Sequence, residues 1–315
     1  MRRALRTTSQ ITANTLQFKR IKKNINGVLL LDKPLGFSSN QALQKVKWLF
    51  SAAKAGHTGT LDPLATGLLP ICLGEATKFA QYVTDADKTY FATIKLGATT
   101  TTGDAEGEVL TTATVNATAA QFAAACQQFL GEISQLPPMY SALKHEGKSL
   151  YEYARAGVNI ARQPRLIAIQ NIVLDKLEGE IAQITVTCSK GTYIRTLAED
   201  IGAALGCGAH LIGLRRTKTA GYLLPQAVTL KQLEAMSIEA RTALLLPVDS
   251  AIESLPVVTL NADAAFFIMQ GQAVWQAGKT PHGDLRLYDQ NNSFLGLGYM
   301  QDDGKIAPKR LIKSS

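Results

Sequence analysis

The chain has 315 residues, 46% of them hydrophobic and 18% charged, which is the balance of a folded protein and excludes wholesale disorder. Its longest apolar runs are far shorter than the ~18–20 residues that span a bilayer, so we expect no transmembrane helix. The four cysteines and four histidines show no metal-ligand spacing, which indicates reduced, buried thiols and argues against a zinc or iron–sulfur protein.

The net charge of +8 is concentrated at the N-terminus. Residues 1–23 hold seven Lys and Arg and no acidic residue, whereas the remainder holds 26 basic and 25 acidic residues. We therefore define residues 1–24 as a basic, flexible arm, which suits a polyanionic partner. Two alternatives are a solvated end without a partner and an organellar presequence, which is also rich in Arg, Ser and Thr and poor in acids.

In the first third of the chain, apolar spacing predicts short strands and helices around one long polar loop. One helix begins after Ser38 or Ser39, either of which can cap it. In the run at 88–97, Tyr90 and every second residue after it share one face, as in a half-buried strand. The expected elements are strands at 27–32, 68–73 and 88–97, helices at 39–50 and 75–83, and a structured loop at 54–68.

The middle of the chain continues this mixture. A helix capped by Thr118 is followed by a proline-led extended stretch that turns at Glu146. Strands and helices do not alternate as regular βαβ units, so we predict an α+β fold with a mixed, antiparallel-rich sheet. The further expected elements are a short helix that ends near 157, β-rich runs at 166–174 and 181–188, a helix at 192–206 and a strand at 211–222.

The character of the sequence changes near residue 247. PVDSAIESLP has the composition of a linker, and short strands separated by turn sequences follow from Val257 onward. We therefore predict a main domain at 25–247 and a small C-terminal β-barrel-like module at 256–315.

The densest cluster of turn-forming and polar residues is GHTGTLDPLATGLLP at 56–70. Its glycines suggest a phosphate-binding loop, but no GK[ST] follows, which argues against a P-loop. The glycines and Pro63 can instead form a purely structural loop in which Asp62 is a cap. Alternatively, they stiffen the loop so that Asp62 is held in one orientation as an exposed catalytic carboxylate.

A family resemblance favours the catalytic interpretation. GHTGTLDPLATGLLPICLGEATKF is similar to the catalytic motif of the TruB family of tRNA pseudouridine synthases. The module at 256–315 resembles the PUA-like RNA-binding module of bacterial, stand-alone members. Five further segments resemble family motifs in the same order, so that the resemblance covers about 24–247: NGVLLLDKPLGFSSNQAL at 26–43, KTYFATIKLG at 88–97, LPPMYSALKHEGKSLYEYARAG at 136–157, CSKGTYIRTLAEDIG at 188–202 and CGAHLIGLRRTKTAGY at 207–222.

The resemblance implies a role for each matching residue. Asp62 is the implied nucleophile and Arg195 its ion-pair partner, because a nearby guanidinium favours an ionised carboxylate. Tyr90 is implied to pack against the target base and to take part in the chemistry. Taken singly, most of these residues are more typical of structural packing. The other implied site residues are Tyr193, which contacts the flipped nucleotide, Leu214, which lines the uridine pocket, His57, which fills the space left by the base, and Lys33 with Pro34, which support the loop.

The implied reaction is the isomerisation of uridine 55 in the T-loop of tRNA to pseudouridine. It needs no redox cofactor, nucleotide or metal, and the sequence has no motif for one. The base must be flipped out of its stack before Asp62 can reach it, and attack at C6, attack at C1′ and proton abstraction from the sugar all remain open. We expect the T-arm of tRNA as the partner, no membrane contact, a monomer and a cytoplasmic location.

Three other functions fit parts of the sequence. A glycosidase would need a second carboxylate opposite Asp62, and Asp32 and Glu75 fall in other expected elements. A guide-RNA-dependent pseudouridine synthase subunit would share the motifs but act within a complex. A non-catalytic RNA-folding chaperone would use the basic arm without depending on Asp62.

Overall fold

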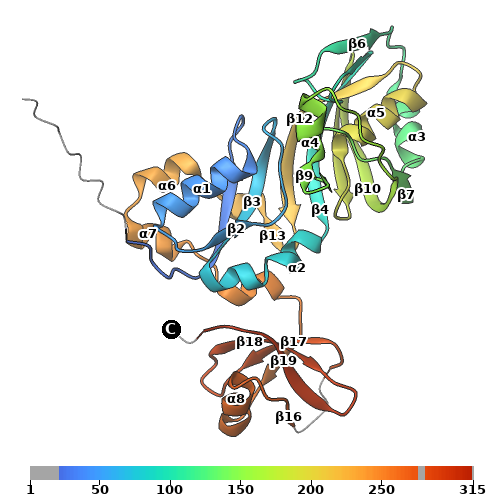
Figure 1. Cartoon of the computed structure of the whole chain (residues 1–315). Coiled ribbons are helices and arrows are strands. Elements are labelled where there is room, and N and C mark those ends of the chain that lie inside the picture. Colours follow the sequence, from blue (N-terminus) through green and yellow to red (C-terminus); the bar gives the residue numbers. More distant parts are fainter. Residues whose placement is uncertain (1–20, 276–280, 314–315) are drawn as a thin grey trace, which may run out of the picture.

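The computed structural model describes residues 21–275 and 281–313. Figure 1 shows a large body with most of the helices and a smaller C-terminal unit beneath it. Lys23 already belongs to the body, because its backbone pairs with Ser51 and Ala53. The arm expected at 1–24 lies outside the described residues as far as position 20. Within the described ranges, no helix has the length and apolar character needed to cross a membrane.

The body is built on a 10-stranded sheet with the order β14-β1-β3-β12-β4-β11-β10-β7, to which β2 adds beside β3 and β13 beside β12. The β1–β14 and β3–β12 pairs are parallel and the other pairs are antiparallel. The predicted α+β class with a mixed, antiparallel-rich sheet is therefore confirmed. The strands are β1 (Gly27–Lys33), β2 (Ala55–His57), β3 (Ala65–Leu73), β4 (Lys88–Leu96), β7 (Gly131–Gln135), β10 (Arg165–Glu178), β11 (Ile181–Cys188), β12 (Ala209–Thr219), β13 (Tyr222–Leu223) and β14 (Val228–Thr229).

Helices cover the sheet where the sequence supplies caps and apolar stripes. Ser38 caps α1 with a capping box that includes Gln41, and Thr118 caps α3 in the same way, as predicted. The segment expected as one helix at 75–83 is split into a 3-10 turn and a short α-helix. The helices of the body are α1 (Ser39–Leu49), α2 (Ala80–Asp85), α3 (Ala119–Gln127), α4 (Leu150–Arg155), α5 (Ile194–Ala204), α6 (Leu230–Ala235) and α7 (Ile238–Ala243), with 3-10 turns η1 (Gly74–Lys78), η2 (Leu224–Gln226) and η3 (Val248–Ile252).

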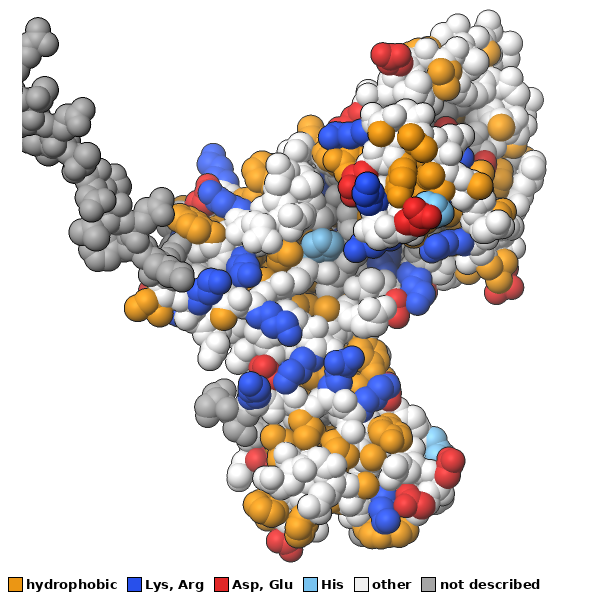
Figure 2. Space-filling model, viewed as in Figure 1, with side chains coloured by type: hydrophobic (Ala, Val, Ile, Leu, Met, Phe, Trp, Pro, Cys, Tyr) orange, Lys and Arg blue, Asp and Glu red, His pale blue; other side chains and the backbone are white. Residues whose placement is uncertain are grey.

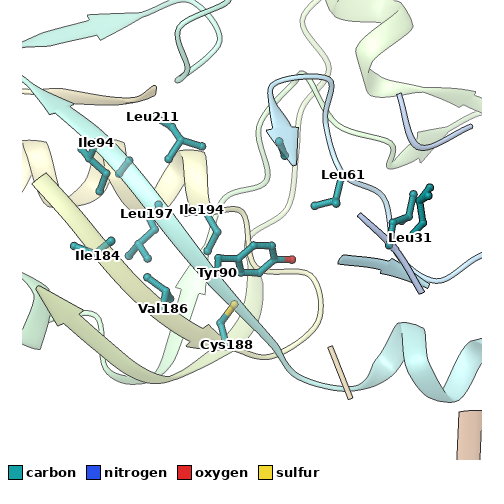
Figure 3. Packing of buried hydrophobic residues seen from close by; sticks show 14 of the residues in the cluster. Leu31, Leu61, Tyr90, Ile94, Ile184, Val186, Cys188, Ile194, Leu197 and Leu211 are labelled. Carbon is teal, nitrogen blue, oxygen red and sulfur yellow. The ribbon is translucent and has the colours of Figure 1, made fainter. Parts of the chain in front are cut away.

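Both faces of the sheet are packed. In β1, Leu29 and Leu31 belong to a core with α1, α3 and α5, whereas Val28 and Leu30 belong to a second core with α2 and η3. This follows from the alternation of side chains along a strand. Figure 3 shows Tyr90 at the edge of the first core, with its hydroxyl pointing away from the core toward the side on which Leu61 lies.

Two small hairpins lie outside the main sheet. β5 (Ala98–Thr100) pairs with β6 (Val109–Thr112), and β8 (Lys144–His145) pairs with β9 (Lys148–Ser149). The second hairpin belongs to the segment between β7 and β10, which turns at Glu146 and Gly147 with positive φ angles of 49° and 84°. Neither hairpin is therefore part of the hydrogen-bonded ladder of the main sheet.

The C-terminal unit is a 5-stranded sheet in the order β15-β17-β18-β19-β16. It also contains a helix, α8 (Ala262–Met269), where only strands were expected. The sequence signal for it was Asn261, whose side chain caps the helix by accepting from the backbone of Ala264. The strands are β15 (Val257–Thr259), β16 (Val274–Trp275), β17 (Asp284–Tyr288), β18 (Phe294–Met300) and β19 (Lys305–Leu311).

The C-terminal unit packs directly on the body. The Phe294 ring lies edge-on to Phe79 at 5.6 Å, and Ala251 and Ile252 of η3 are buried, so the expected linker is part of the core. Lys78 Nζ donates to Leu311 O at 2.7 Å across the same junction. Figure 2 shows basic side chains gathered where the unit meets the body. Polar contacts at this junction involve Lys78, Lys309 and Lys313.

Candidate active site

A cavity of about 660 Å³ opens between the 57–62 loop, the strands β4 and β12, the start of α5 and the segment before β10. Lys33, in contrast, is fully buried beside the loop, where its ammonium donates to Pro34 O and Phe37 O. The structure thus places six of the seven predicted site residues around one cavity and the seventh behind it. The six that line the cavity are His57, Asp62, Tyr90, Tyr193, Arg195 and Leu214.

The loop that carries Asp62 is held on both sides of that residue. Ser39 Oγ accepts from Leu61 N at 2.7 Å and donates to Leu61 O at 2.9 Å. On the other side, Gly36 N donates to Pro63 O at 2.9 Å, and the Asp62 carbonyl accepts from Ala65 N at 3.0 Å. Because α1 and the turn before it fix the loop, the Asp62 side chain projects from a rigid support.

Arg195 forms an ion pair with Asp62. The distance from Arg195 Nη2 to Asp62 Oδ2 is 3.0 Å, and the side chains are 7% and 44% exposed. Arg195 lies in the first turn of α5 and also donates to Thr102 O at 3.2 Å and to Tyr140 O at 2.6 Å. The guanidinium is therefore a fixed donor, while the carboxylate that it orients remains open to the cavity.

A second carboxylate, Asp104, lies on the opposite side of the same guanidinium. Its Oδ2 is 3.4 Å from Arg195 Nη1, and its side chain is 4% exposed. Its Oδ1 accepts from Thr102 Oγ1 and from Glu106 N, which fixes the carboxylate. Sequence reasoning missed Asp104, which is not among the predicted site residues. The available signal was the position of this acidic residue between Gly103 and Gly107, because Gly and Asp together are typical of a tight turn.

The pKa of Asp62 is raised from its ordinary value. Burial is the main cause and the charge of Asp104 adds to it, whereas Arg195 and Lys33 oppose it. The expected effect of Arg195 is present, but loss of water around the carboxylate outweighs it. Asp62 is thus a carboxylate whose ionisation depends strongly on the guanidinium beside it.

Two tyrosines provide flat apolar surface in the cavity. Tyr90 lies in β4 and is 8% exposed. Tyr193 is the N-cap of α5, and Gln135 fixes its backbone by accepting from Tyr193 N at 2.8 Å and donating to Tyr193 O at 3.1 Å. Burial raises the pKa of both phenols, so each stays protonated near neutral pH. Such rings can pack on a planar, uncharged base.

Several basic side chains line the cavity or lie close to it. Burial lowers the pKa of Lys33 and of Lys88 to about 8. Burial and the charge of Arg216 lower the pKa of His57, so its imidazole is neutral near pH 7. Arg216, which sequence reasoning also missed, lines the cavity two residues after Leu214, on the same face of β12.

This arrangement presents one oriented carboxylate to a cavity with aromatic and aliphatic walls. Such a carboxylate can act as a nucleophile or as a base toward a planar ring, since Arg195 holds its geometry and its charge. Across the described ranges, His, Cys, Asp and Glu side chains form no cluster suited to a metal ion. The oriented carboxylate of Asp62 is itself the observation that supports carboxylate chemistry.

Comparisons with known proteins agree over most of the chain. The model for the TruB family pseudouridylate synthase (N terminal domain) matches residues 47–194, and models for the tRNA pseudouridylate synthase B C-terminal domain and the pseudouridine synthase II TruB C-terminal region match 195–253 and 256–312. A protein of Methylobacillus flagellatus named tRNA pseudouridine synthase B is 60% identical over 95% of this chain and 99% of its own length. One of the same name from Stutzerimonas stutzeri is 53% identical with the same coverage. A chain in a structure titled "Crystal Structure of a Cbf5-Nop10-Gar1 Complex" is 27% identical, with a TM-score of 0.69 over 91% of this chain and 84% of that one.

Proposed function

The chain belongs to the TruB family of pseudouridylate synthases, and from this premise we propose that it isomerises uridine 55 in the T-loop of tRNA. As a member of that family it is an isomerase that converts uridine in RNA to pseudouridine. The names of its relatives support tRNA as its substrate. The nucleotide position and the loop are the finer proposal, which the resemblance of its motifs supports.

The observation that carries the proposal is the Asp62–Arg195 ion pair at the wall of the cavity. We assign Asp62 as the nucleophile, because its carboxylate is oriented at 3.0 Å from a buried guanidinium and 44% of its side chain is exposed. We assign Arg195 as the residue that orients it and holds its charge. Asp104, on the other side of Arg195, fixes the guanidinium.

The reaction balances without another reactant. The bond between N1 and C1′ breaks, a bond between C5 and C1′ forms, C5 loses its proton and N1 gains one. Asp62 can form a transient covalent bond with either C6 or C1′, and its departure restores the carboxylate. No electrons are gained or lost overall, so the residues of the cavity suffice.

The proposal requires the target base to leave its stack. Asp62 faces a cavity formed by protein on several sides, and a base stacked within a duplex cannot reach that position. We propose that the flipped base packs on Tyr90 and contacts Tyr193, and that Leu214 lines its apolar side. The neutral imidazole of His57 can fill the space that the flipped base leaves in its RNA stack, since stacking there needs no charge.

The remaining surfaces fit a long polyanion. Basic side chains gather where the C-terminal unit meets the body (Figure 2), and we propose that they and the basic arm at 1–24 contact RNA phosphates. We further propose that residues 25–247 are the catalytic domain, that 256–315 are the RNA-binding module, and that the chain acts as a cytoplasmic monomer. The naming of the relatives fits this proposal better than a guide-RNA-dependent subunit.

Bare tRNA transcript tests the proposal directly. Purified full-length protein, without added protein or RNA, should form pseudouridine at position 55, and a transcript with cytidine at that position should stay unmodified. The Asp62→Asn variant should be inactive, whereas Asp175→Asn, which removes an exposed carboxylate of β10 outside the cavity, should match wild type. Modification at another position would contradict the site assignment, and activity only with an added guide RNA would favour the guide-dependent alternative.

A further inference from the structure

Arg216 is a buried cation without an acidic partner among the described residues. The residue is 1% exposed, and the ion pairs among the described residues do not include it. Its neighbour Arg215 points to the other face of β12 and pairs with Asp32 at 2.7 Å. Because an unpaired buried charge is costly, its presence at the cavity points to a role beyond packing.

The guanidinium of Arg216 joins two of the elements that build the site. Its Nε donates to Leu68 O in β3 at 2.7 Å, and its Nη2 donates to Gly59 O at 3.2 Å. Gly59 has a φ of 96° and lies in the loop that ends in Asp62. One side chain of β12 therefore connects that loop to the neighbouring strand β3.

Arg216 is also the neighbour of Tyr90 in the sheet. Arg216 lies directly opposite Tyr90 in the β12–β4 pair, and the ladder slips by one residue immediately afterwards, where Lys218 pairs with Thr89. A bulge at such a place re-aims the adjoining side chains. The charge of Arg216 opposes the rise that burial causes in the pKa of Tyr90, so the guanidinium lies within electrostatic reach of the phenol.

Chemistry fixes how the two groups can interact. A guanidinium has only donors, so the phenol oxygen of Tyr90 can face Arg216 only as an acceptor. The phenol proton then points elsewhere, and the hydroxyl of Tyr90 already points out of the hydrophobic core (Figure 3). In this arrangement Tyr90 offers a donor to whatever occupies the cavity.

We propose that Arg216 is a positioning residue for pseudouridine formation, which orients the hydroxyl of Tyr90 and ties it to the loop of Asp62. The inference rests on the role proposed above for Tyr90. Arg216 does not touch the reacting atoms; it sets the distance and the direction between two groups that do. A purely structural Arg216, which only stabilises the β3–β12 contact, is the competing explanation.

A spectroscopic measurement separates the two explanations without relying on activity. Full-length protein labelled with ¹³C at tyrosine Cζ gives one resonance for Tyr90, identified by its loss in Tyr90→Phe. In Arg216→Met this resonance should shift and its titration should move to higher pH, since the charge that opposes burial is gone. The matched control is Arg215→Met, which removes a cation from the adjacent position of β12 and should leave the resonance unchanged.

Kinetics provide the second readout. Arg216→Met should lower the single-turnover rate on tRNA about 100-fold, as expected when a group at the site is misplaced by ~1 Å, while tRNA affinity stays within about threefold. In a Tyr90→Phe background the same substitution should cost less than about threefold, because residues that act through one another are not additive. If Arg216→Met does not fold, Arg216→Lys is measured instead, since one ammonium cannot reproduce the fork to the carbonyls of Leu68 and Gly59.

An unchanged Tyr90 resonance in the Arg216 variant would overturn the inference. So would a wild-type rate, or a rate loss that is the same with and without the Tyr90 hydroxyl. The proposed function fails in a different way: wild-type protein would then leave position 55 unmodified, whatever the Tyr90 resonance does.

Discussion

Replacing Arg195 with methionine should slow pseudouridine formation and move its acid limb to higher pH. In the structure one guanidinium faces two carboxylates, at 3.0 Å from Asp62 and 3.4 Å from Asp104. Without it, both lose their counter-ion and repel each other. The pKa of Asp62, already raised by burial and by Asp104, must then rise further, because Arg195 is the largest influence that lowers it.

The size of the shift follows from the distances and the exposure. An opposite charge at ion-pair distance lowers a carboxyl pKa by about 1–3 units, so its removal raises the pKa by a similar amount. Asp62 keeps 44% of its side chain exposed, and solvent screening therefore favours the low end, about 1 unit. The nucleophile must be ionised, so the rate falls about tenfold per pH unit below its pKa. The ratio of variant to wild-type rate should thus rise about tenfold from the acid to the alkaline side.

A second, pH-independent loss adds to this shift. Arg195 also donates to the carbonyls of Thr102 and Tyr140, and its removal leaves Asp62 without the group that orients it. Misplacement of a catalytic group by ~1 Å costs about 100-fold in rate, so high pH should restore only part of the activity. The free energy of unfolding should fall by about 3–5 kcal/mol, because the substitution breaks the buried ion pair between Arg195 and Asp104.

Tritium release from tRNA labelled at C5 of uridine tests these expectations. It is measured in single turnover from about pH 5.5 to about pH 9, roughly two units on either side of neutrality. Arg241→Met is the matched control, because Arg241 also donates to backbone carbonyls, those of Leu49, Leu233 and Glu234, but lies away from the cavity. It should cost stability without moving the pH profile. A pH–rate profile of Arg195→Met that parallels wild type would refute the reasoning.

Three further outcomes are expected. Asp62→Asn should abolish tritium release while tRNA affinity, measured by filter binding, stays within about tenfold, since RNA is held by many phosphate and stacking contacts; substantial residual turnover would exclude the nucleophile role. Gly67→Ala should lower the free energy of unfolding in a denaturant titration by about 2–4 kcal/mol, because a Cβ there would lie 2.4 Å from Arg216 O at a φ of 98°. Gly36→Ala should lower the free energy of unfolding clearly less, because Gly36 has a φ of 80° but no atom within 4 Å of the added Cβ. Equal losses in the two variants would contradict the steric argument. Deletion of residues 1–20 should reduce the slope of the logarithm of the tRNA binding constant against log salt by about 0.7–0.9 for each phosphate that the arm neutralises. Saturated turnover should change little. Equal slopes for the full-length and truncated proteins would indicate an arm that does not contact RNA.

Local sequence determined much of the secondary structure. The period-2 pattern from Tyr90 to Leu96 became a strand with those alternate side chains buried, and Ser38 and Thr118 cap helices as their position predicts. Such features depend on residues within a few positions of one another, so spacing alone reveals them. The site residues came from motif resemblance, since Asp62 by itself fitted a structural turn equally well. The helix α8 was missed, because its capping residue follows directly on a strand in a region dominated by turns.

Only the tertiary structure decided which distant groups share the cavity. Asp104 was hidden in a polar loop until the structure placed it against Arg195, and Arg216 gained significance only from its position opposite Tyr90. These contacts depend on the sheet order, which sets β12 between β3 and β4, and on bulges that change which face a side chain occupies. Burial then altered the chemistry: the guanidinium of Arg195 lowers the pKa of Asp62, yet the removal of water by the surrounding elements outweighs it. The sequence could identify the charged groups, but their net effect depends on how much solvent the assembled fold leaves around them.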